Sequence, residues 1–168
     1  DESYQFDFYD GGGLDLCYLG LAEVDIDGNV NVSRLGSRIT GSGGFTNISS
    51  ASKKAVFCGT FTNGVKIQTG DGKLTILEEG KKHKFVNKVT EITFSGVVAG
   101  KNNKDVLYVT ERAVFALKAD GVHLIEVAPG VDVKTQVLDQ MDFEPIVDRD
   151  ENGNVKLMDA RIFTDEVM

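Results

Sequence analysis

Nearly continuous apolar runs of strand length mark two places in the chain. Residues 14–21 read Leu-Asp-Leu-Cys-Tyr-Leu-Gly-Leu, and residues 55–61 read Ala-Val-Phe-Cys-Gly-Thr-Phe. Runs of this kind are typical of strands that are buried on both faces, as in a parallel sheet lined by helices. They predict a core of the α/β class.

Elsewhere polar and apolar residues alternate with period two, which predicts antiparallel hairpins. Glycine-containing turns separate the alternating runs and suit tight hairpins. The predicted hairpins cover residues 22–32, 65–77 and 113–127, and residues 84–94 continue the antiparallel pattern. His123 lies in the hairpin of residues 113–127, so we expect an exposed strand residue and not a catalytic base.

One helix is indicated near the end of the chain. Val133, Val137, Leu138 and Met141 share one helical face, and Asp132 is a suitable N-cap. Residues 49–55 are small and polar and predict either a short helix or a loop. The residues after 142 are acidic, which is typical of a solvated surface.

Composition excludes several partners. The chain has 168 residues and a formal net charge of −8, so it offers no basic field to nucleic acid or an anionic membrane. It contains 41% hydrophobic residues but no apolar run of about 18 residues that would predict a membrane span. Its length suits one domain, residues 1–168.

Cysteine, histidine and lysine positions add little chemistry. Cys17 and Cys58 lie in the two apolar runs, so we expect two buried free thiols in a reduced, cytoplasmic protein. The two cysteines and two histidines are far apart in sequence, and we expect no metal site. The basic run of residues 81–84 is interpreted as a lysine-protected edge or turn in preference to a phosphate site.

The stretch with the most chemical interest is residues 40–50, Thr-Gly-Ser-Gly-Gly-Phe-Thr-Asn-Ile-Ser-Ser. It holds Gly41, Gly43 and Gly44 within four positions. Glycine accepts positive φ and close approach of another group, so such a loop can direct several backbone N–H groups at one oxygen. A surface turn between two strands explains the same residues, and spacing alone leaves both interpretations open.

Several segments, this loop among them, occur in a specific order. They are Gly11-Gly12-Gly13-Leu14-Asp15-Leu16, Gly28-Asn29-Val30-Asn31, Gly41-Ser42-Gly43-Gly44-Phe45, Thr110-Glu111-Arg112-Ala113-Val114-Phe115 and Val127-Ala128-Pro129-Gly130-Val131-Asp132. Together they resemble family I coenzyme A transferases, in particular the C-terminal, beta-like part of the acetate, propionate and 3-ketoacid CoA-transferases. The resemblance implies a largely parallel sheet of the CoA-transferase (NagB/RpiA-like) type with an antiparallel β-hairpin section.

The resemblance also implies an activity. Such enzymes move coenzyme A between a short-chain acyl-CoA and acetate or a ketoacid through a glutamyl-CoA thioester, which is covalent catalysis. Coenzyme A is then a substrate, and no permanently bound cofactor is implied. The expected partners are the acyl-CoA, the carboxylate, the remainder of the CoA-transferase chain and further copies in a homo-oligomer.

The family's nucleophilic glutamate lies in a Glu-(Asn/Ser)-Gly-type motif. Glu23, Glu78, Glu79 and Glu111 stand in other contexts, so we expect the motif to lie upstream of this chain. The chain also begins at Asp1 without an initiating Met. We therefore interpret it as the C-terminal segment of a longer CoA-transferase, inactive alone.

By the same resemblance, the glycine loop lies beside the thioester. Gly43 and Gly44 are expected to donate backbone N–H groups to the oxyanion, and Gly41 to form the turn. Phe45 and Asn47 are expected to line the coenzyme A site. Glu111 and Arg112 are interpreted as a buried ion pair in preference to a substrate contact.

A second interpretation from a different functional class stays open. The chain can instead be a non-enzymatic CoA-binding or assembly module that lacks the catalytic part. A Glu-x-Gly motif a few tens of residues upstream of Asp1 would favour the transferase.

Overall fold

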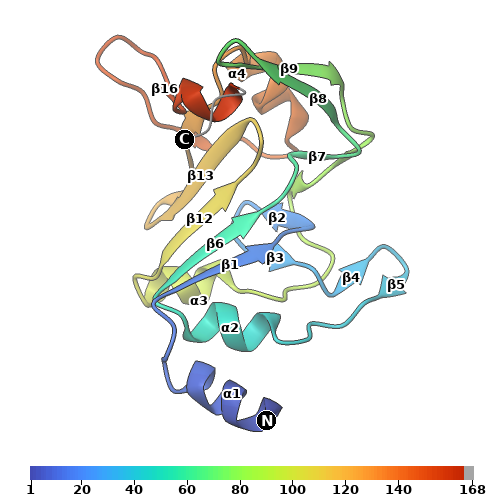
Figure 1. Ribbon diagram of the computed structural model, residues 1–168, viewed down its shortest axis with the longest axis vertical. Helices are drawn as coiled ribbons and strands as arrows, with labels where there is room; N and C mark the ends of the chain where they lie inside the picture. The colour runs from blue at the N-terminus through green and yellow to red at the C-terminus, as the bar shows by residue number, and fades with distance from the viewer. Residues whose placement is uncertain (165–168) are drawn as a thin grey trace.

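The computed structural model describes residues 1–164 and is built on a seven-stranded mixed sheet (Figure 1). The strand order is β1-β6-β12-β13-β14-β15, with β16 also paired to β14. The first three strands are mutually parallel, and β13 is antiparallel to both of its neighbours. The strands are β1 Leu16–Gly20, β6 Lys54–Cys58, β12 Asp105–Val109, β13 Ala113–Lys118, β14 Gly121–Val127, β15 Ile146–Val147 and β16 Lys156–Leu157.

Smaller sheets surround this one. The hairpins predicted at residues 65–77 and 113–127 are confirmed, and the turn at Asp27-Gly28 joins two antiparallel strands as expected. The additional strands are β2 Glu23–Asp25, β3 Val30–Asn31 and β11 Phe85–Val86 in one sheet, and the pairs β4 Arg34–Leu35 with β5 Arg38–Ile39, β7 Thr62–Asn63 with β10 Lys82–His83, and β8 Lys66–Gly70 with β9 Lys73–Glu78. The predicted α/β class, with a mostly parallel sheet and antiparallel hairpins, is confirmed.

The helices are short. They are α1 Glu2–Asp10, α2 Phe45–Ala51, α3 Gly96–Lys101 and α4 Val133–Gln136, with 3-10 turns η1 Leu138–Gln140 and η2 Ala160–Phe163. Asp132 caps α4 as predicted, accepting a 2.8 Å hydrogen bond from the Thr135 N–H. The predicted continuous helix is wrong beyond Gln136, because Val137 leaves the helical conformation and inserts fully into the core.

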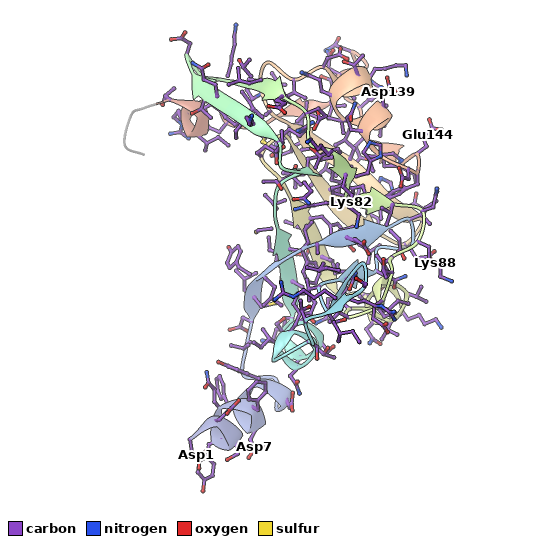
Figure 2. The ribbon with its side chains drawn as sticks, turned by 90° about the vertical axis from the view of Figure 1, so that its right-hand side faces the viewer. Asp1, Asp7, Lys82, Lys88, Asp139 and Glu144 are labelled. Atoms are coloured by element: carbon purple, nitrogen blue, oxygen red, sulfur yellow. The ribbon has the colours of Figure 1, made fainter. Side chains whose placement is uncertain are left out.

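One face of the large sheet forms the main core. Phe57 of β6 lies at its centre, where its ring stacks on Phe45 of α2 at 5.5 Å and on Tyr108 of β12 at 5.9 Å. Phe94 completes this group, with its ring centroid 4.9 Å from that of Phe57. Aromatic pairs at such separations contribute about 0.5–1.5 kcal/mol beyond burial itself. Figure 2 shows that the segments carrying Lys82, Lys88 and Glu144 lie on the same side of β6 and β12.

Two predictions about exposed and buried residues are wrong. His123 is buried. Its Nδ1 lies 2.7 Å from a carboxylate oxygen of Asp148, next to β15, and its Nε2 lies 2.8 Å from one of Asp120. Cys58 is exposed, although Cys17 is buried as expected and both are free thiols. Cys58 and residues of β1 lie on the sheet face opposite the main core, so residues 14–21 are not buried on both faces.

The antiparallel continuation at residues 84–94 is also wrong in part. β11 pairs in parallel with β2, whereas Phe94 makes an isolated antiparallel bridge to Val30. Phe85 of β11 packs between Phe61 and Phe115, at 4.8 and 4.7 Å between ring centroids. The direction of β11 is therefore set by this tertiary packing and not by a local turn.

A close backbone approach joins α3 to the turn between β2 and β3. A Cβ on Gly96 would lie 2.2 Å from the carbonyl oxygen of Asp27 and 2.5 Å from the carbonyl carbon of Gly28. The Gly96 N–H also donates to the side-chain oxygen of Asn29 at 2.9 Å. Only glycine fits here without moving backbone.

Gly96→Ala is expected to lower the free energy of unfolding by about 1–3 kcal/mol, because the added methyl group forces this contact apart. Gly100→Ala in the same helix is the matched control, since a Cβ there meets nothing within 4 Å. That change is expected to be neutral or stabilising by up to about 1 kcal/mol. Denaturant unfolding measures both, and equal effects would contradict the close approach.

Candidate functional site

The glycine loop leads directly into α2. Gly41 and Gly43 have φ of +79° and +51°, in the left-handed region, and Gly44 is the N-cap of the helix. A Cβ on Gly41 or Gly43 would meet nothing within 4 Å. Within residues 1–164, the N–H groups of Gly43 and Gly44 donate to no acceptor. The loop therefore presents two adjacent donors, with open space beside Gly43.

Backbone and hydroxyl hydrogen bonds hold both ends of this loop. Ser33 accepts from the N–H groups of Thr40 and Gly41 at 2.9 and 3.2 Å. The Thr46 hydroxyl donates to the carbonyl oxygen of Thr93 at 3.2 Å, and the Thr93 hydroxyl lies 2.9 Å from that of Ser33. The loop position thus depends on the segments around Ser33 and Thr93.

A cavity of about 270 Å³ lies beside the loop. Its polar wall includes Arg34 and Glu91, which form an exposed ion pair at 4.0 Å. Exposed pairs of this kind stabilise little, so Arg34 can turn to another anion at small cost. The lining residues are Ser33, Arg34, Ile39, Gly41, Ser42, Thr46, Glu91, Ile92 and Thr93.

The structure places the other predicted site residues differently. The Phe45 ring is buried in the main core, so it supports the loop from below. Asn47 donates to both carboxylate oxygens of Asp10 at 3.0 and 3.1 Å. A Cβ on Gly44 would lie 2.8 Å from the ring of Phe6. Helix α1 therefore covers one side of the loop, at Gly44 and Asn47.

A buried polar network, which the sequence interpretation missed, supports the loop from β2 and β3. Glu23 accepts hydrogen bonds from the side chain of Asn31 at 2.8 Å and from the N–H of Thr90 at 2.9 Å. Asn31 in turn accepts from the N–H groups of Ser33 and Arg34, both at 3.1 Å. Glu23 thus connects the segment of Thr90 to the segment that holds the glycine loop.

Asp25 likewise connects the turn between β2 and β3 to the segment of Val89. Its carboxylate accepts from the N–H and the side chain of Asn29 at 3.0 and 3.1 Å, and from the N–H of Val89 at 3.2 Å. The visible signal was a period-two series of polar residues, Glu23, Asp25, Asn29 and Asn31, in a segment with apolar Val24 and Val30. All four polar side chains are buried and hydrogen-bonded.

The ionisation of Glu23 follows from these contacts. Burial opposes its charged form, but hydrogen bonds from Thr90, Asn31 and Lys82 outweigh that cost and lower the pKa of its carboxyl. Lys82 adds an ion pair at 3.1 Å. Glu23 is therefore a structural carboxylate, held charged and fully engaged.

Three side chains of the basic run at residues 81–84 contact other residues of the chain. Lys82 pairs with Glu23, His83 lies 2.6 Å from Asp142, and Lys84 donates to the Thr60 hydroxyl at 3.0 Å. Burial lowers the pKa of Lys84. These contacts support the structural interpretation over a phosphate site.

Glu111 and Arg112 form the expected buried ion pair, at 2.8 Å. The fully buried guanidinium also reaches Glu79 at 2.6 Å and lies over the ring of Phe61 at 5.0 Å. Burial opposes ionisation of Glu79, yet its hydrogen bonds with Arg112 and Thr62 lower the pKa of that carboxyl. The pair braces the ends of β12 and β13.

One tripeptide does match the nucleophile motif, contrary to expectation. Glu151-Asn152-Gly153 lies in the turn between β15 and β16, where all three residues are exposed and Asp150 accepts from the Asn152 N–H at 2.9 Å. In Figure 1 this turn lies at the top, whereas α2 and its glycine loop lie near the bottom. Glu151 therefore does not complete the site at the glycine loop.

Two kinds of site find no support in the described part of the chain. Within residues 1–164, no group of three or more His, Cys, Asp or Glu side chains is arranged to hold a metal ion. None of the described helices has the length and apolar character needed to cross a membrane.

Known CoA-transferases are similar in sequence to this chain over nearly its whole length. Acetate CoA-transferase YdiF of Escherichia coli O157:H7 is 54% identical over 169 residues, covering 100% of this chain and 31% of that protein. Caffeate CoA-transferase of Acetobacterium woodii is 44% identical over 171 residues, covering 99% of this chain and 32% of that protein. The chain thus spans about a third of the length of these relatives. A comparison with protein-family models gives no match.

Solved structures of a CoA-transferase also match the fold of this chain. The apoenzyme of acyl-CoA transferase YdiF from Escherichia coli O157:H7 matches with a TM-score of 0.93 at 53% identity, over 99% of this chain and 32% of that chain. A thioester complex of YdiF with CoA matches equally well, with a TM-score of 0.93 at 54% identity, over 98% of this chain and 32% of that chain. Throughout its length the chain is homologous to part of the coenzyme A transferases, which confirms the resemblance in the sequence.

A more distant likeness concerns the fold alone. The decarboxylase AibA/AibB is 18% identical, with a TM-score of 0.64 over 91% of this chain and 54% of that chain. The same fold therefore occurs in a protein named for a different reaction, and function has to be argued from the site.

Glu23→Gln is expected to lower the free energy of unfolding by about 1–3 kcal/mol at pH 7, because the negative charge is lost and an amide NH2 replaces one of the two carboxylate oxygens that accept hydrogen bonds. The folded-state pKa lies below the ordinary value of 4.5, so the wild-type advantage is present above that value and is lost as the pH falls through the folded-state pKa. Unfolding measured from pH 7 to pH 3 tests this.

Glu78→Gln is the control, since Glu78 is exposed and, among residues 1–164, forms an ion pair only with exposed Lys66. Its effect is expected to stay within about 0.5 kcal/mol. An equal loss in both variants, or a Glu23→Gln loss that does not change with pH, would contradict the role given to Glu23.

Proposed function

We propose that this chain is the C-terminal segment of an acyl-CoA:carboxylate CoA-transferase and supplies one side of its active site. The observation that carries the proposal is the glycine loop, with the N–H groups of Gly43 and Gly44 unused within the described residues. The names of the relatives, acetate and caffeate CoA-transferase, support coenzyme A and a carboxylate as substrates. The YdiF complex with CoA supports a thioester as the bound species.

In the proposed mechanism, a glutamate upstream of this chain attacks the acyl-CoA carbonyl. Its carboxylate oxygen bonds to that carbon, and the electron pair of the C=O moves onto oxygen. The Gly43 and Gly44 N–H groups stabilise this oxyanion, and one such donor contributes about 3–4 kcal/mol to the transition state. The CoA thiolate leaves, then attacks the glutamyl carbonyl to give glutamyl-CoA and release the acyl group as carboxylate.

Other loop residues have supporting roles in this proposal. Gly41 forms the turn, Phe45 holds the loop against the core, and Asn47 lies at the edge that α1 covers. The absence of a side chain at Gly43 leaves room for the thioester, since a Cβ there projects into open space. The parent protein is proposed to be a cytoplasmic homo-oligomer.

In the full-length protein, Gly44→Val is expected to lower kcat for CoA transfer by at least about 10²-fold, because the side chain keeps the carbonyl away from the donors. Its Cβ would also meet the ring of Phe6. The double variant Phe6→Ala/Gly44→Val relieves that contact and is expected to stay inactive. Gly100→Ala, outside the loop, is expected to leave kcat unchanged.

Full activity in Gly44→Val would contradict the oxyanion role. Recovery in the double variant would instead assign the loss to displacement of α1. Cooperative unfolding of each variant confirms that the fold is intact.

The 168-residue chain alone is expected to show no CoA transfer from acetyl-CoA to propionate, because the nucleophile lies upstream. A coupled assay of propionyl-CoA formation measures this, with the full-length protein as the positive control. Turnover by the purified chain alone would contradict the upstream position of the nucleophile. It would direct attention to Glu151 in the one matching tripeptide of the chain.

A further inference from the structure

The glycine loop follows a hairpin that gives it little support. Among the described strands, β4 and β5 pair only with each other, and all four of their residues are exposed. Figure 1 shows this hairpin extending away from the large sheet, between β3 and α2. The start of the loop is therefore fixed at the base of the hairpin, where residues 32–33 leave β3 and residues 40–41 return.

The hydroxyl of Thr93 lies at this base, in a residue that is only 7% exposed. It accepts hydrogen bonds from the N–H of Val32 at 3.1 Å and from the N–H of Ser33 at 3.3 Å. Ser33 shares that N–H with the side-chain oxygen of Asn31, at 3.1 Å. The Thr93 oxygen also lies 2.9 Å from the Ser33 hydroxyl. A hydroxyl has one proton and two lone pairs, so with both lone pairs engaged its proton is left for the Ser33 oxygen.

Residues 32 and 33 transmit this constraint to the loop. The carbonyl of Val32 accepts from the Thr40 hydroxyl at 2.8 Å, and the carbonyl of Ser33 accepts from the N–H groups of Thr40 and Gly41. Because a peptide group is planar, the carbonyl of Val32 and the N–H of Ser33 belong to one rigid unit. Thr93 holds this unit on one side and Thr40 holds it on the other.

The main chain of Thr93 holds the other end of the loop. Its carbonyl accepts from the hydroxyl of Thr46, in the first turn of α2, at 3.2 Å. Its N–H donates to the carbonyl of Val30 at 2.9 Å, and the next residue, Phe94, packs against Phe57 in the core. The backbone of Thr93 is thus fixed independently of its side chain, and this one residue contacts both ends of the loop.

We propose that Thr93 is a positioning residue for CoA transfer, whose hydroxyl fixes the direction in which the N–H groups of Gly43 and Gly44 point. It acts through Ser33 and the loop, and not by contact with substrate. The inference rests on the proposed function in taking these N–H groups as oxyanion donors. Such donors act only from the place where the charge develops, and a misplacement of about 1 Å can cost on the order of 10²-fold in rate.

Substitutions of Thr93 in the full-length protein test the proposal. Thr93→Val replaces the hydroxyl by a methyl group and keeps the backbone contacts. We expect it to lower kcat by about 10- to 100-fold with KM changed less than about threefold, because the lost interaction acts mainly in the transition state. Thr93→Ser keeps the hydroxyl and is expected to retain kcat within about threefold. Thr75→Val, at an exposed position of β9, is the matched control and is expected to leave kcat unchanged.

Combination with Gly44→Val separates a positioning role from a purely structural one. Because Thr93 acts through the loop donors, Thr93→Val is expected to lower kcat no further when Gly44→Val has already disabled them. Two losses that multiply in full would overturn the proposal. Wild-type kcat in Thr93→Val would also overturn it, as would an equal loss in Thr93→Ser. Thr46→Val, expected to lower kcat by at least about threefold, serves where Thr93→Val fails to fold.

Hydrogen exchange gives a readout that does not depend on turnover. The N–H groups of Thr40 and Gly41 are expected to exchange at least about tenfold faster in Thr93→Val than in the wild type, because their acceptor is no longer held. Unchanged exchange would overturn the positioning role even where kcat falls. Full activity of Gly44→Val would instead contradict the proposed function, and the exchange rates would then still decide whether Thr93 holds the loop.

Discussion

The glycine loop depends on two buried carboxylates whose hydrogen bonds reach far along the chain. Glu23 accepts from Thr90, and Asp25 from Val89, so β2 holds a segment more than sixty residues away. The same network includes Asn31, which orders Ser33, and Ser33 accepts the two N–H groups at the start of the loop. A buried charge without its partners is costly, so this network tolerates few changes. The local geometry of the loop is therefore a consequence of tertiary structure.

The two faces of the large sheet are used differently. The face with Phe57 and Tyr108 is filled by aromatic stacking and by α2, which begins at the glycine loop. The loop is thereby attached to the closely packed aromatic core, as a preorganised donor site requires. The opposite face, which carries the exposed residues Tyr18 and Cys58, has no such cover within residues 1–164. The proposed nucleophile is assigned to the rest of the longer protein.

Local patterns explain what the sequence predicted correctly. The parallel strands and the hairpin around Gly70-Asp71-Gly72 follow from apolar runs and turn residues, which act over a few positions. The burial of His123, the exposure of Cys58 and the direction of β11 depend on strand partners and packing between distant segments. In the site, the glycines of the loop were recognisable in the sequence. The buried network was not, because alternating polar residues in a strand ordinarily indicate an exposed face.

We propose that the glycine loop holds the oxyanion of a CoA thioester. A structure of the full-length protein with a bound acyl-CoA or its glutamyl-CoA thioester tests this most directly. We expect the thioester carbonyl oxygen to lie about 2.7–3.1 Å from the backbone nitrogens of Gly43 and Gly44. A thioester bound elsewhere, with these N–H groups directed at solvent, would contradict it.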